Sequence, residues 1–487
     1  MDHKNILCLS ANVIQRPGIR VFTSIHELLH GPCSQFLYFM VHLMNRSPIY
    51  DIAVIGSGIA GMSAAWLLSQ KHNVTVYERE GRLGGHSNTV EVPGGQDPVP
   101  VDTGFIVYNE RNYPNLTALF KYLDVPTKDS EMSFAASLDD GAMEYSGTDI
   151  NGMLGQRRNL FRPRFWTMLR DVKRFYRDAP EFLSNHSRDW SLGRYLKEHG
   201  YSKAFIEDHL LPMGGAIWSA SATEMLDFPA AAFIRFFDSH GLLEIVNRPT
   251  WRTVDGGSRE YVKRLTQNYR NSVLLNKPAK SIHRSDGGVF VIGDDGDRRS
   301  FDHVVIASHA DQALGLLADA STRERRWLGA IRYSKNRAVL HNDMRLMPKR
   351  RRVWSSWNYL QSRQKSDETS LCVTYWMNRL QGIDPSTPLF VTLNPHIEPE
   401  AARIMGEFSY EHPLFDSGAL NAQQHLWSLQ GRHNTWFCGS YFGYGFHEDA
   451  LQSGLAVAEA IGGVRRPWTV AGESDRISLP QAASAAA

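Results

Sequence analysis

Cysteine is scarce in this sequence, and its four copies follow no pairing pattern. Cys8, Cys33, Cys372 and Cys438 are scattered over 487 residues, and no two of them are spaced as Cys-x-x-Cys. Folds that depend on disulfides are richer in cysteine, and structural zinc sites need clustered ligands. We therefore expect neither a disulfide framework nor a metal site, and the composition is typical of a reducing cytoplasm.

Long apolar runs and an excess of one charge are also missing. The apolar stretch at 36–44 is far shorter than the roughly 18 residues that would span a bilayer. Lysine and arginine total 53 and aspartate and glutamate total 51, so the composition gives no general reason to bind nucleic acid. The apolar fraction of 42% and the length indicate a globular protein larger than one small domain.

The two ends of the chain differ from the rest. For residues 1–48 we predict a poorly ordered N-terminal extension; the alternatives are a start codon assigned too early, with Met44 as the true start, and a segment that contacts a membrane or a partner. A secretory signal fits poorly, because basic residues are sparse at the start and no small-residue cleavage site follows. Residues 466–487 contain Pro467, Pro480 and a run of Ser and Ala, which predicts a disordered tail.

A strand, a glycine-rich turn and a helix open the main part of the chain. The apolar run 50–55 predicts a strand buried on both faces, and 62–70 is rich in helix-forming residues. Between them stands Gly56-Ser57-Gly58-Ile59-Ala60-Gly61, with the spacing Gly-x-Gly-x-x-Gly. The first glycine allows the tight turn, the second lets a pyrophosphate approach the backbone, and the third lets the helix pack closely on the strand.

A carboxylate and a second glycine pair follow the next strand, 74–77. Glu78 comes 22 residues after Gly56, a spacing that suits hydrogen bonds to a ribose hydroxyl. Arg79, Arg82 and the pair Gly84-Gly85 then place cations and bare backbone near a diphosphate or a flavin edge. Nicotinamide dehydrogenases do not need this second pair, so the motif favours FAD over NAD.

Taken together, these motifs resemble those of the flavin-containing amine oxidase superfamily, which includes monoamine oxidases, phytoene desaturases and protoporphyrinogen oxidases. The resemblance extends over about 49–465. It also rests on Val101-Asp102-Thr103-Gly104, on Gly256-Gly257 before a helix near Arg259, on Phe437-Cys438-Gly439-Ser440, and on the glycine-rich segment 443–454. Cys438 lies in the last strand rather than in a flavin-attachment loop, so we expect non-covalent FAD.

The resemblance implies an α/β fold: a discontinuous Rossmann-type FAD-binding domain with an inserted mixed α+β substrate domain, as in amine oxidases and phytoene desaturases. The FAD-binding parts are 49–110, 249–324 and 431–465; the substrate parts are 111–248, mainly helical, and 325–430. The residues expected to contact FAD are Gly56, Gly58, Ile59, Ala60, Gly61, Glu78, Arg79, Arg82, Gly84, Gly85, His86, Thr103, Gly104, Phe105, Ala279, Gly439, Ser440, Phe446, His447 and Glu448.

More narrowly, the phrases 101–110, 225–229 and 375–381 resemble a bacterial group of NAD/FAD-binding oxidoreductases. Members of that group are often associated with methyltransferases similar to cyclopropane fatty acid synthase. The resemblance thus implies removal of hydride from a hydrophobic, lipid acyl-chain substrate, as in desaturation. An amine oxidase and a non-redox flavin-dependent isomerase are the alternatives. Ser440-Tyr441, where Thr-Glu is common, and His86, where arginine is common, place a primary amine substrate in doubt.

Several side chains are candidates for chemistry. The helix that begins near Asp449 is expected to direct its positive N-terminal end at the flavin and to stabilise negative charge there. His86, Tyr108 and His447 are the candidates for a direct role, and His309 is a weaker one. Each has an alternative as a hydrogen-bonding wall of the site. Trp218, Tyr375 and Trp376 are either cavity-lining or core residues.

A basic and aromatic segment bears on location. Eight arginines and lysines at 157–177 alternate with aromatic and aliphatic residues, and Lys349-Arg350-Arg351-Arg352 before Trp354 forms a second group. Such segments suit an anionic membrane surface. The alternative is a solvated basic face over a packed apolar one. We therefore expect a cytoplasmic protein, with a peripheral position on the inner face of the membrane as the further expectation.

Overall fold

The computed structural model describes residues 48–94, 97–185, 190–244, 248–285, 288–362 and 371–480. The chain divides into two compact units, Met1–Ile49 and Tyr50–Ala487, and the second is described below. Nearly all of the predicted N-terminal extension, and residues 481–487 of the predicted tail, lie outside the described residues.

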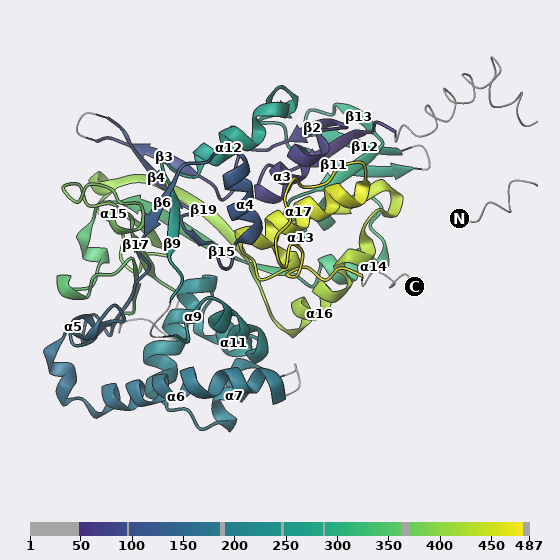
Figure 1. Ribbon diagram of the computed structural model, residues 1–487. Coiled ribbons are helices and arrows are strands. Elements are labelled where there is room, and N and C mark those ends of the chain that lie inside the picture. The colour runs from purple at the N-terminus through teal and green to yellow at the C-terminus, as the bar shows by residue number, and fades with distance from the viewer. Residues whose placement is uncertain are drawn as a thin grey trace, which may run out of the picture. The chain divides into compact units, whose positions relative to one another are not determined.

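A five-stranded parallel sheet forms the first layer, and β1 lies at its centre. Its order is β10 (Val273–Leu274), β2 (Asn73–Tyr77), β1 (Asp51–Ile55), β14 (His303–Ile306) and β20 (Thr435–Phe437). Residues Ile52 to Ile55 are buried because helices cover the sheet, which explains the continuous apolar run. On one face, α3 (Ile59–Leu68) and α17 (His447–Ile461) pack side by side (Figure 1). The expected strand-turn-helix-strand unit is present.

Smaller elements complete this half of the molecule. A three-stranded antiparallel sheet consists of β11 (Ala279–Ser285), β12 (Gly288–Gly293) and β13 (Arg298–Phe301). The helix expected near Arg259 is present as α12 (Arg259–Thr266). Further helices are α4 (Pro114–Tyr122), α13 (Ala310–Leu316), α14 (Thr322–Leu328) and α16 (Ser417–Leu426). The strands β3 (Thr89–Val92) and β4 (Val99–Asp102) form a hairpin, and β5 (Tyr108–Asn109), β9 (Trp251–Val254) and β6 (Thr127–Ser130) form a small sheet in that order.

A seven-stranded sheet forms the second layer. Its order is β19 (Ile404–Leu414), β15 (Arg332–His341), β18 (Phe390–Leu393), β17 (Val373–Trp376), β16 (Trp357–Leu360), β7 (Phe134–Leu138) and β8 (Met143–Ser146). The pair β7 and β16 is parallel, and every other neighbouring pair is antiparallel. The segment 111–248 was expected to be mainly helical. It also supplies the strands β7 and β8 to this sheet, whose other strands belong to the segment 325–430.

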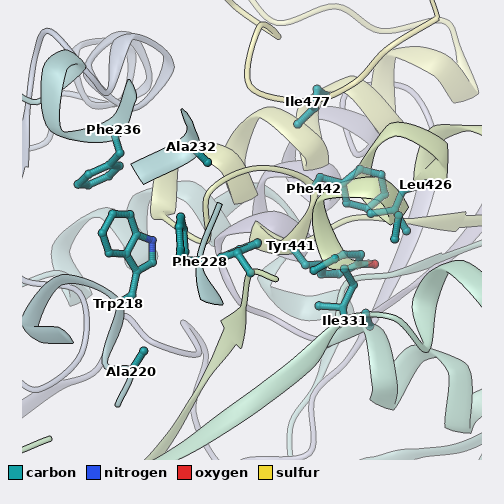
Figure 2. Packing of buried hydrophobic residues seen from close by; sticks show 14 of the residues in the cluster. Trp218, Ala220, Phe228, Ala232, Phe236, Ile331, Leu426, Tyr441, Phe442 and Ile477 are labelled. Carbon is teal, nitrogen blue, oxygen red and sulfur yellow. The ribbon is translucent and has the colours of Figure 1, made fainter. Parts of the chain in front are cut away.

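A helical layer follows β8 in the chain. It comprises α5 (Ile150–Met153), the 3-10 turn η1 (Arg157–Phe161), α6 (Pro163–Asn185), α7 (Leu192–Glu198), α8 (Lys203–Phe205), η2 (Ile206–Leu210), α9 (Leu211–Trp218), α10 (Ala222–Asp227) and α11 (Ala230–Ser239). Its aromatic residues belong to a large core. Figure 2 shows Trp218, Phe228 and Phe236 from this layer in the same buried cluster as Tyr441 and Phe442 from the segment before α17.

The predicted disordered tail is wrong for residues 466–480. Arg466 is buried, and its guanidinium group donates to both carboxylate oxygens of Glu459, at 2.8 and 2.9 Å. Trp468 stacks on Trp66 of α3, with ring centroids 5.9 Å apart. These two side chains hold the segment against the helices, an interaction that composition alone does not reveal. In the described part of the chain, no helix combines the length and the apolar character needed to cross a membrane.

Candidate functional site

One large cavity of about 1,790 Å³ lies between the two sheets and the helical layer. The carboxyl ends of β1 and β2, the turn after β14 and the start of α17 line one part of it. In open α/β sheets, ligands bind outside the carboxyl ends of the strands. This part of the cavity is therefore where the fold itself places a cofactor site.

The glycine-rich turn has the geometry that its spacing predicts. Gly56 has a φ of +99°, which suits glycine, and a Cβ there would lie 2.9 Å from the carbonyl oxygen of Ala307. At Gly61 a Cβ would collide with the carbonyl oxygen of Gly56, so α3 packs directly on the turn. By contrast, a Cβ at Gly58 would have no protein atom within 4 Å, and Gly58 lines the cavity.

The acidic and basic residues after β2 hold this turn. Glu78 Oε2 accepts hydrogen bonds from the backbone N–H (3.0 Å) and hydroxyl (2.6 Å) of Ser57, and Oε1 accepts one from Glu80 N–H at 2.8 Å. Arg82 donates to the carbonyl oxygen of Gly85 at 2.8 Å. Glu78 and Arg82 thus lie at the cavity and also fix the loops that border it.

Residues 103–105 are held in place by a buried polar network. Asp102 accepts hydrogen bonds from Ser258 N–H, from the hydroxyls of Ser258 and Thr89, and from Gln381. Burial raises the pKa of Asp102 to about 6, against the lowering effect of these donors. Thr103 hydrogen-bonds to Tyr410 OH at 2.7 Å. These hydrogen bonds hold Thr103, Gly104 and Phe105 in position at the cavity wall.

The first residue of α17 is part of a second network. His447 Nε2 lies 2.8 Å from Tyr261 OH and 3.1 Å from Ser87 Oγ, and its ring stacks on Phe105 with centroids 3.8 Å apart. Burial lowers the pKa of His447 to about 3, so the imidazole is neutral near pH 7. His447 is therefore fixed as a neutral wall of the cavity next to the N-terminus of α17.

Two further histidines and a glutamate join His86 in the cavity wall. The His86 ring lies 5.4 Å from that of His412 and 5.0 Å from that of Tyr410. His309 Nδ1 lies 3.2 Å from Glu411 Oε2, and its ring stacks on Tyr333. The sequence did not predict the contribution of β19, because Tyr410, Glu411 and His412 have no motif spacing. Alternation along the strand was the one signal available.

The histidines of this cluster are held neutral. Burial is the main cause that lowers the pKa of His86 well below its ordinary value, and the neighbouring His412, His309 and His447 add to it. Burial likewise lowers the pKa of His412 to about 4. Within the described residues, His86 Nε2 is buried without a hydrogen-bond partner. A buried polar atom of this kind on a cavity wall is suited to contact a bound group.

Three of the predicted site residues lie elsewhere. Tyr108 is not at the cavity; its buried ring packs edge-on against Phe120 and Tyr113. Glu448 faces away from the cavity, because its carboxylate accepts from the backbone N–H groups of Asn115 and Leu116 at the start of α4. Gly61 serves helix packing behind the turn. Neither a catalytic role for Tyr108 nor a cofactor contact for Glu448 agrees with these positions.

Apart from Trp376, the remaining predicted residues meet at the cavity. Trp218 and Tyr375 line it, whereas Trp376 packs on Trp354 outside it. Cys438 is buried, and neither it nor Cys372, the other described cysteine, lines the cavity. The predicted cofactor residues found on the wall are Gly56, Gly58, Ile59, Ala60, Glu78, Arg79, Arg82, Gly84, Gly85, His86, Thr103, Gly104, Phe105, Ala279, Gly439, Ser440, Phe446 and His447.

These residues fit a dinucleotide. The open space over Gly58 lies at the start of α3, whose first N–H groups have no carbonyl partner within the helix and attract anions. A model of the family of flavin-containing amine oxidoreductases matches residues 59–333, more than half of the chain. The chain belongs to this flavin-containing amine oxidoreductase family. Its cofactor is a flavin, and the motifs identify it as FAD.

One curated relative, a bacterial protein with a monoamine oxidase name, is distantly similar to this chain. The curated relative "Putative flavin-containing monoamine oxidase AofH" of Mycobacterium tuberculosis is 28% identical over 257 residues. The match includes 50% of this chain and spans only 54% of that relative.

Two solved structures share the fold. A fatty acid isomerase of P. acnes that produces CLA has a TM-score of 0.59 and 16% identity, over 84% of this chain and 97% of that one. Cyclohexylamine oxidase of Brevibacterium oxydans has a TM-score of 0.60 and 16% identity, over 85% and 99%. At this identity the likeness shows the fold alone, and it confirms the expected FAD-binding and substrate-domain architecture.

Proposed function

We propose that this protein is an FAD-dependent oxidoreductase that removes a hydride from a lipid acyl chain, as in a desaturation. The observation that carries the proposal is the second part of the cavity. From the flavin motifs the cavity continues between the seven-stranded sheet and the helical layer. An acyl chain needs an apolar channel of this kind, joined to the cofactor site without a break.

The walls of this second part are mostly aliphatic and aromatic. The sheet contributes Phe134, Trp357, Tyr375, Leu393 and Phe408. The helical layer contributes Leu169, Val172, Met213, Ile217 and Trp218 among others. Burying apolar substrate surface is worth about 25 cal/mol per Å², so such walls bind a long hydrocarbon strongly and exclude water from the reacting carbon.

The chain's own residues bind and orient the substrate and exclude water from the site. The bound flavin supplies the hydride acceptor. The α17 N-terminus carries partial positive charge, which stabilises negative charge nearby. His86 and His412 are weak proton acceptors, because burial favours their neutral forms. We therefore assign them hydrogen bonds to bound groups. In a desaturation the hydride goes to the flavin and a proton leaves the adjacent carbon, and we assign the acceptance of that proton to the Glu411 carboxylate on the cavity wall.

The comparisons favour two other activities. The AofH relative and cyclohexylamine oxidase carry amine oxidase names, and the P. acnes structure is a fatty acid isomerase. The similarity to a fatty acid isomerase supports a lipid substrate for this chain. An isomerisation, however, leaves the oxidation state of the substrate unchanged. The apolar walls of the second part favour an acyl chain over a small charged amine, and hydride removal remains the proposed reaction.

One anaerobic experiment separates the three activities. Purified holoenzyme is mixed with a phospholipid bearing a long acyl chain or with a panel of primary amines, and the visible absorbance of oxidised flavin is followed. We expect bleaching by the lipid alone, together with a lipid product two hydrogens lighter by mass spectrometry. Bleaching by an amine would establish the amine oxidase, and a product of unchanged mass would establish the isomerase.

A further inference from the structure

Exposed apolar side chains are concentrated beside one edge of the cavity. Phe161 is 85% exposed and Ile150 is 79% exposed, and Leu160 and Trp166 are exposed in the same short stretch. The indole N–H of Trp166 donates to the carbonyl oxygen of Leu160 at 2.9 Å, which fixes that ring across η1. Large apolar groups rarely gather on a surface without a binding role.

Two basic segments that are distant in the sequence meet at this place. Gly155, just before η1, packs on Val353 and Arg352, so a Cβ there would collide with Val353. Upstream, Glu144 binds the backbone N–H of Lys349 at 2.7 Å and pairs with Arg350. The exposed residues Ile150, Arg157, Arg158, Phe161, Arg351 and Arg352 together form what we call the rim patch.

The positive charge of the rim patch is not neutralised. Among the described residues, Arg157, Arg158, Arg351 and Arg352 form no ion pair with a carboxylate. Further along α6 the arginines are paired: Arg164 with Glu207 and Asp208, Arg174 with Asp171, and Arg177 with Asp178. The basic segment 157–177 is therefore not one uniform face. Its exposed unpaired arginines Arg157 and Arg158 lie at its N-terminal end, next to Phe161, and Lys173, for which the described residues supply no ion pair either, lines the cavity.

The rim patch lies at an entrance of the cavity. Ile150 belongs both to the patch and to the cavity wall, as the first residue of α5. Leu169, Val172 and Lys173 of α6 line the same cavity. In the chain only a short segment that contains η1 separates α5 from α6, and Figure 1 shows both helices below the strands of the seven-stranded sheet. A chain entering between them would meet apolar residues from the surface inward.

We propose that the rim patch docks on an anionic lipid bilayer and that the substrate acyl chain enters the cavity from the bilayer between α5 and α6. This inference rests on the proposed function for the identity of the entering chain. Aromatic and aliphatic tips beside arginines are the combination that binds at a membrane interface, with the rings in the acyl boundary and the cations at the headgroups. The positive charge commits the partner to an anionic surface.

The test measures docking without turnover. Holoenzyme is sedimented with vesicles of phosphatidylcholine and phosphatidylglycerol at low salt, and with phosphatidylcholine alone. The variant Arg157→Gln/Arg158→Gln is compared with Arg323→Gln/Arg325→Gln, which removes the same charge from exposed positions on α14. Each cation near an anionic surface contributes a factor of about five in affinity, so we expect binding at least tenfold weaker for the first pair only.

A second pair tests the apolar contribution. Phe161→Ser should weaken vesicle binding, whereas Leu275→Ser, an exposed position beyond β10, should not. Indifference of the wild type to anionic vesicles, equal effects of test and control variants, or a change of oligomeric state in the Arg157→Gln/Arg158→Gln variant would each overturn the proposal. Vesicle binding without lipid oxidation would leave docking in place and reject only the proposed reaction.

Discussion

Gly58 and Gly61 are three residues apart, yet they are glycines for different reasons. A Cβ at Gly61 would collide with the carbonyl oxygen of Gly56, so Gly61 is required by the fold. A Cβ at Gly58 meets no protein atom, and the backbone there is extended, with a φ of −64° that any residue adopts. Only a bound group explains why Gly58 must lack a side chain.

Gly58→Val is therefore expected to abolish FAD retention while the apoprotein keeps its stability to within about 0.5 kcal/mol. Gly61→Val is the matched control and should destabilise the apoprotein by at least about 1–3 kcal/mol, through the collision with the turn. FAD released on denaturation and the urea unfolding of apoprotein are the two measurements. Full FAD content in Gly58→Val would show that the pyrophosphate does not lie over this residue.

Glu78→Gln should weaken FAD binding without abolishing it. The substitution removes a charge-assisted hydrogen bond worth about 1.5–3 kcal/mol, which is roughly ten- to hundredfold in Kd. Fluorescence titration of apoprotein with FAD measures the change, and Glu91→Gln on β3 is the control. An unaltered Kd would mean that the carboxylate serves Ser57 and Glu80 alone.

At the scale of elements, α17 joins the cavity to α4 through two adjacent residues. His447 points into the network with Tyr261 and Ser87, and Glu448 accepts the N–H groups at the start of α4. A carboxylate at a helix N-terminus is stabilised by the partial positive charge there. The sequence places the two residues side by side in a flavin motif, but the helix directs them to different neighbours.

Glu448→Gln should lower the free energy of unfolding and leave FAD binding nearly unchanged. The amide presents an N–H₂ group to N–H donors, and lost hydrogen bonds to a charged group cost about 1.5–3 kcal/mol. Urea unfolding of the apoprotein should show this loss, while the FAD Kd stays within about twofold. Glu198→Gln, exposed on α7, should change neither quantity. A Kd raised as much as in Glu78→Gln would restore Glu448 to the cofactor site.

The elements that the sequence predicts well are those whose secondary structure depends on residues close to one another in the chain. The run 50–77 contains β1, the glycine turn, α3 and β2, and each is recognisable from local composition. The seven-stranded sheet was not predictable in the same way, because β7 and β16 pair in parallel across more than two hundred residues. The contribution of Glu411 and His412 to the cavity depends on that sheet. Such pairings leave no local pattern.

At the scale of the whole molecule, buried neutral histidines recur in the described residues. Burial lowers the pKa of His209, His341 and His412 to about 4, and of His240 and His447 to about 3. His341, outside the cavity, is fully buried, and in its neutral form its Nδ1 accepts the backbone N–H of Asp343 at 3.0 Å.

The apoprotein should therefore lose stability as pH falls from about 6.5 towards 5. The unfolded chain takes up protons at its ordinary histidine pKa while the native state does not, which costs up to about 1.4 kcal/mol per histidine and pH unit. Burial raises the pKa values of Asp102 and Asp449 to about 6, so these two groups stabilise the native state as pH falls. They are fewer than the buried histidines, whose effect therefore prevails. Unfolding free energies across this range should show a smaller slope in His341→Gln than in the wild type, and an equal slope would contradict the prediction.

The order in which the chain is synthesised has a consequence for its cofactor. Gly58 is synthesised well before the opposite wall of the cavity, which includes Gly439 and His447. The sheet itself needs β20, which pairs with β14 from the far end of the chain. A nascent polypeptide therefore carries its phosphate-binding turn before the opposite wall of the FAD site exists. We expect stable FAD binding only after β20 and the start of α17 have been made and have joined the sheet.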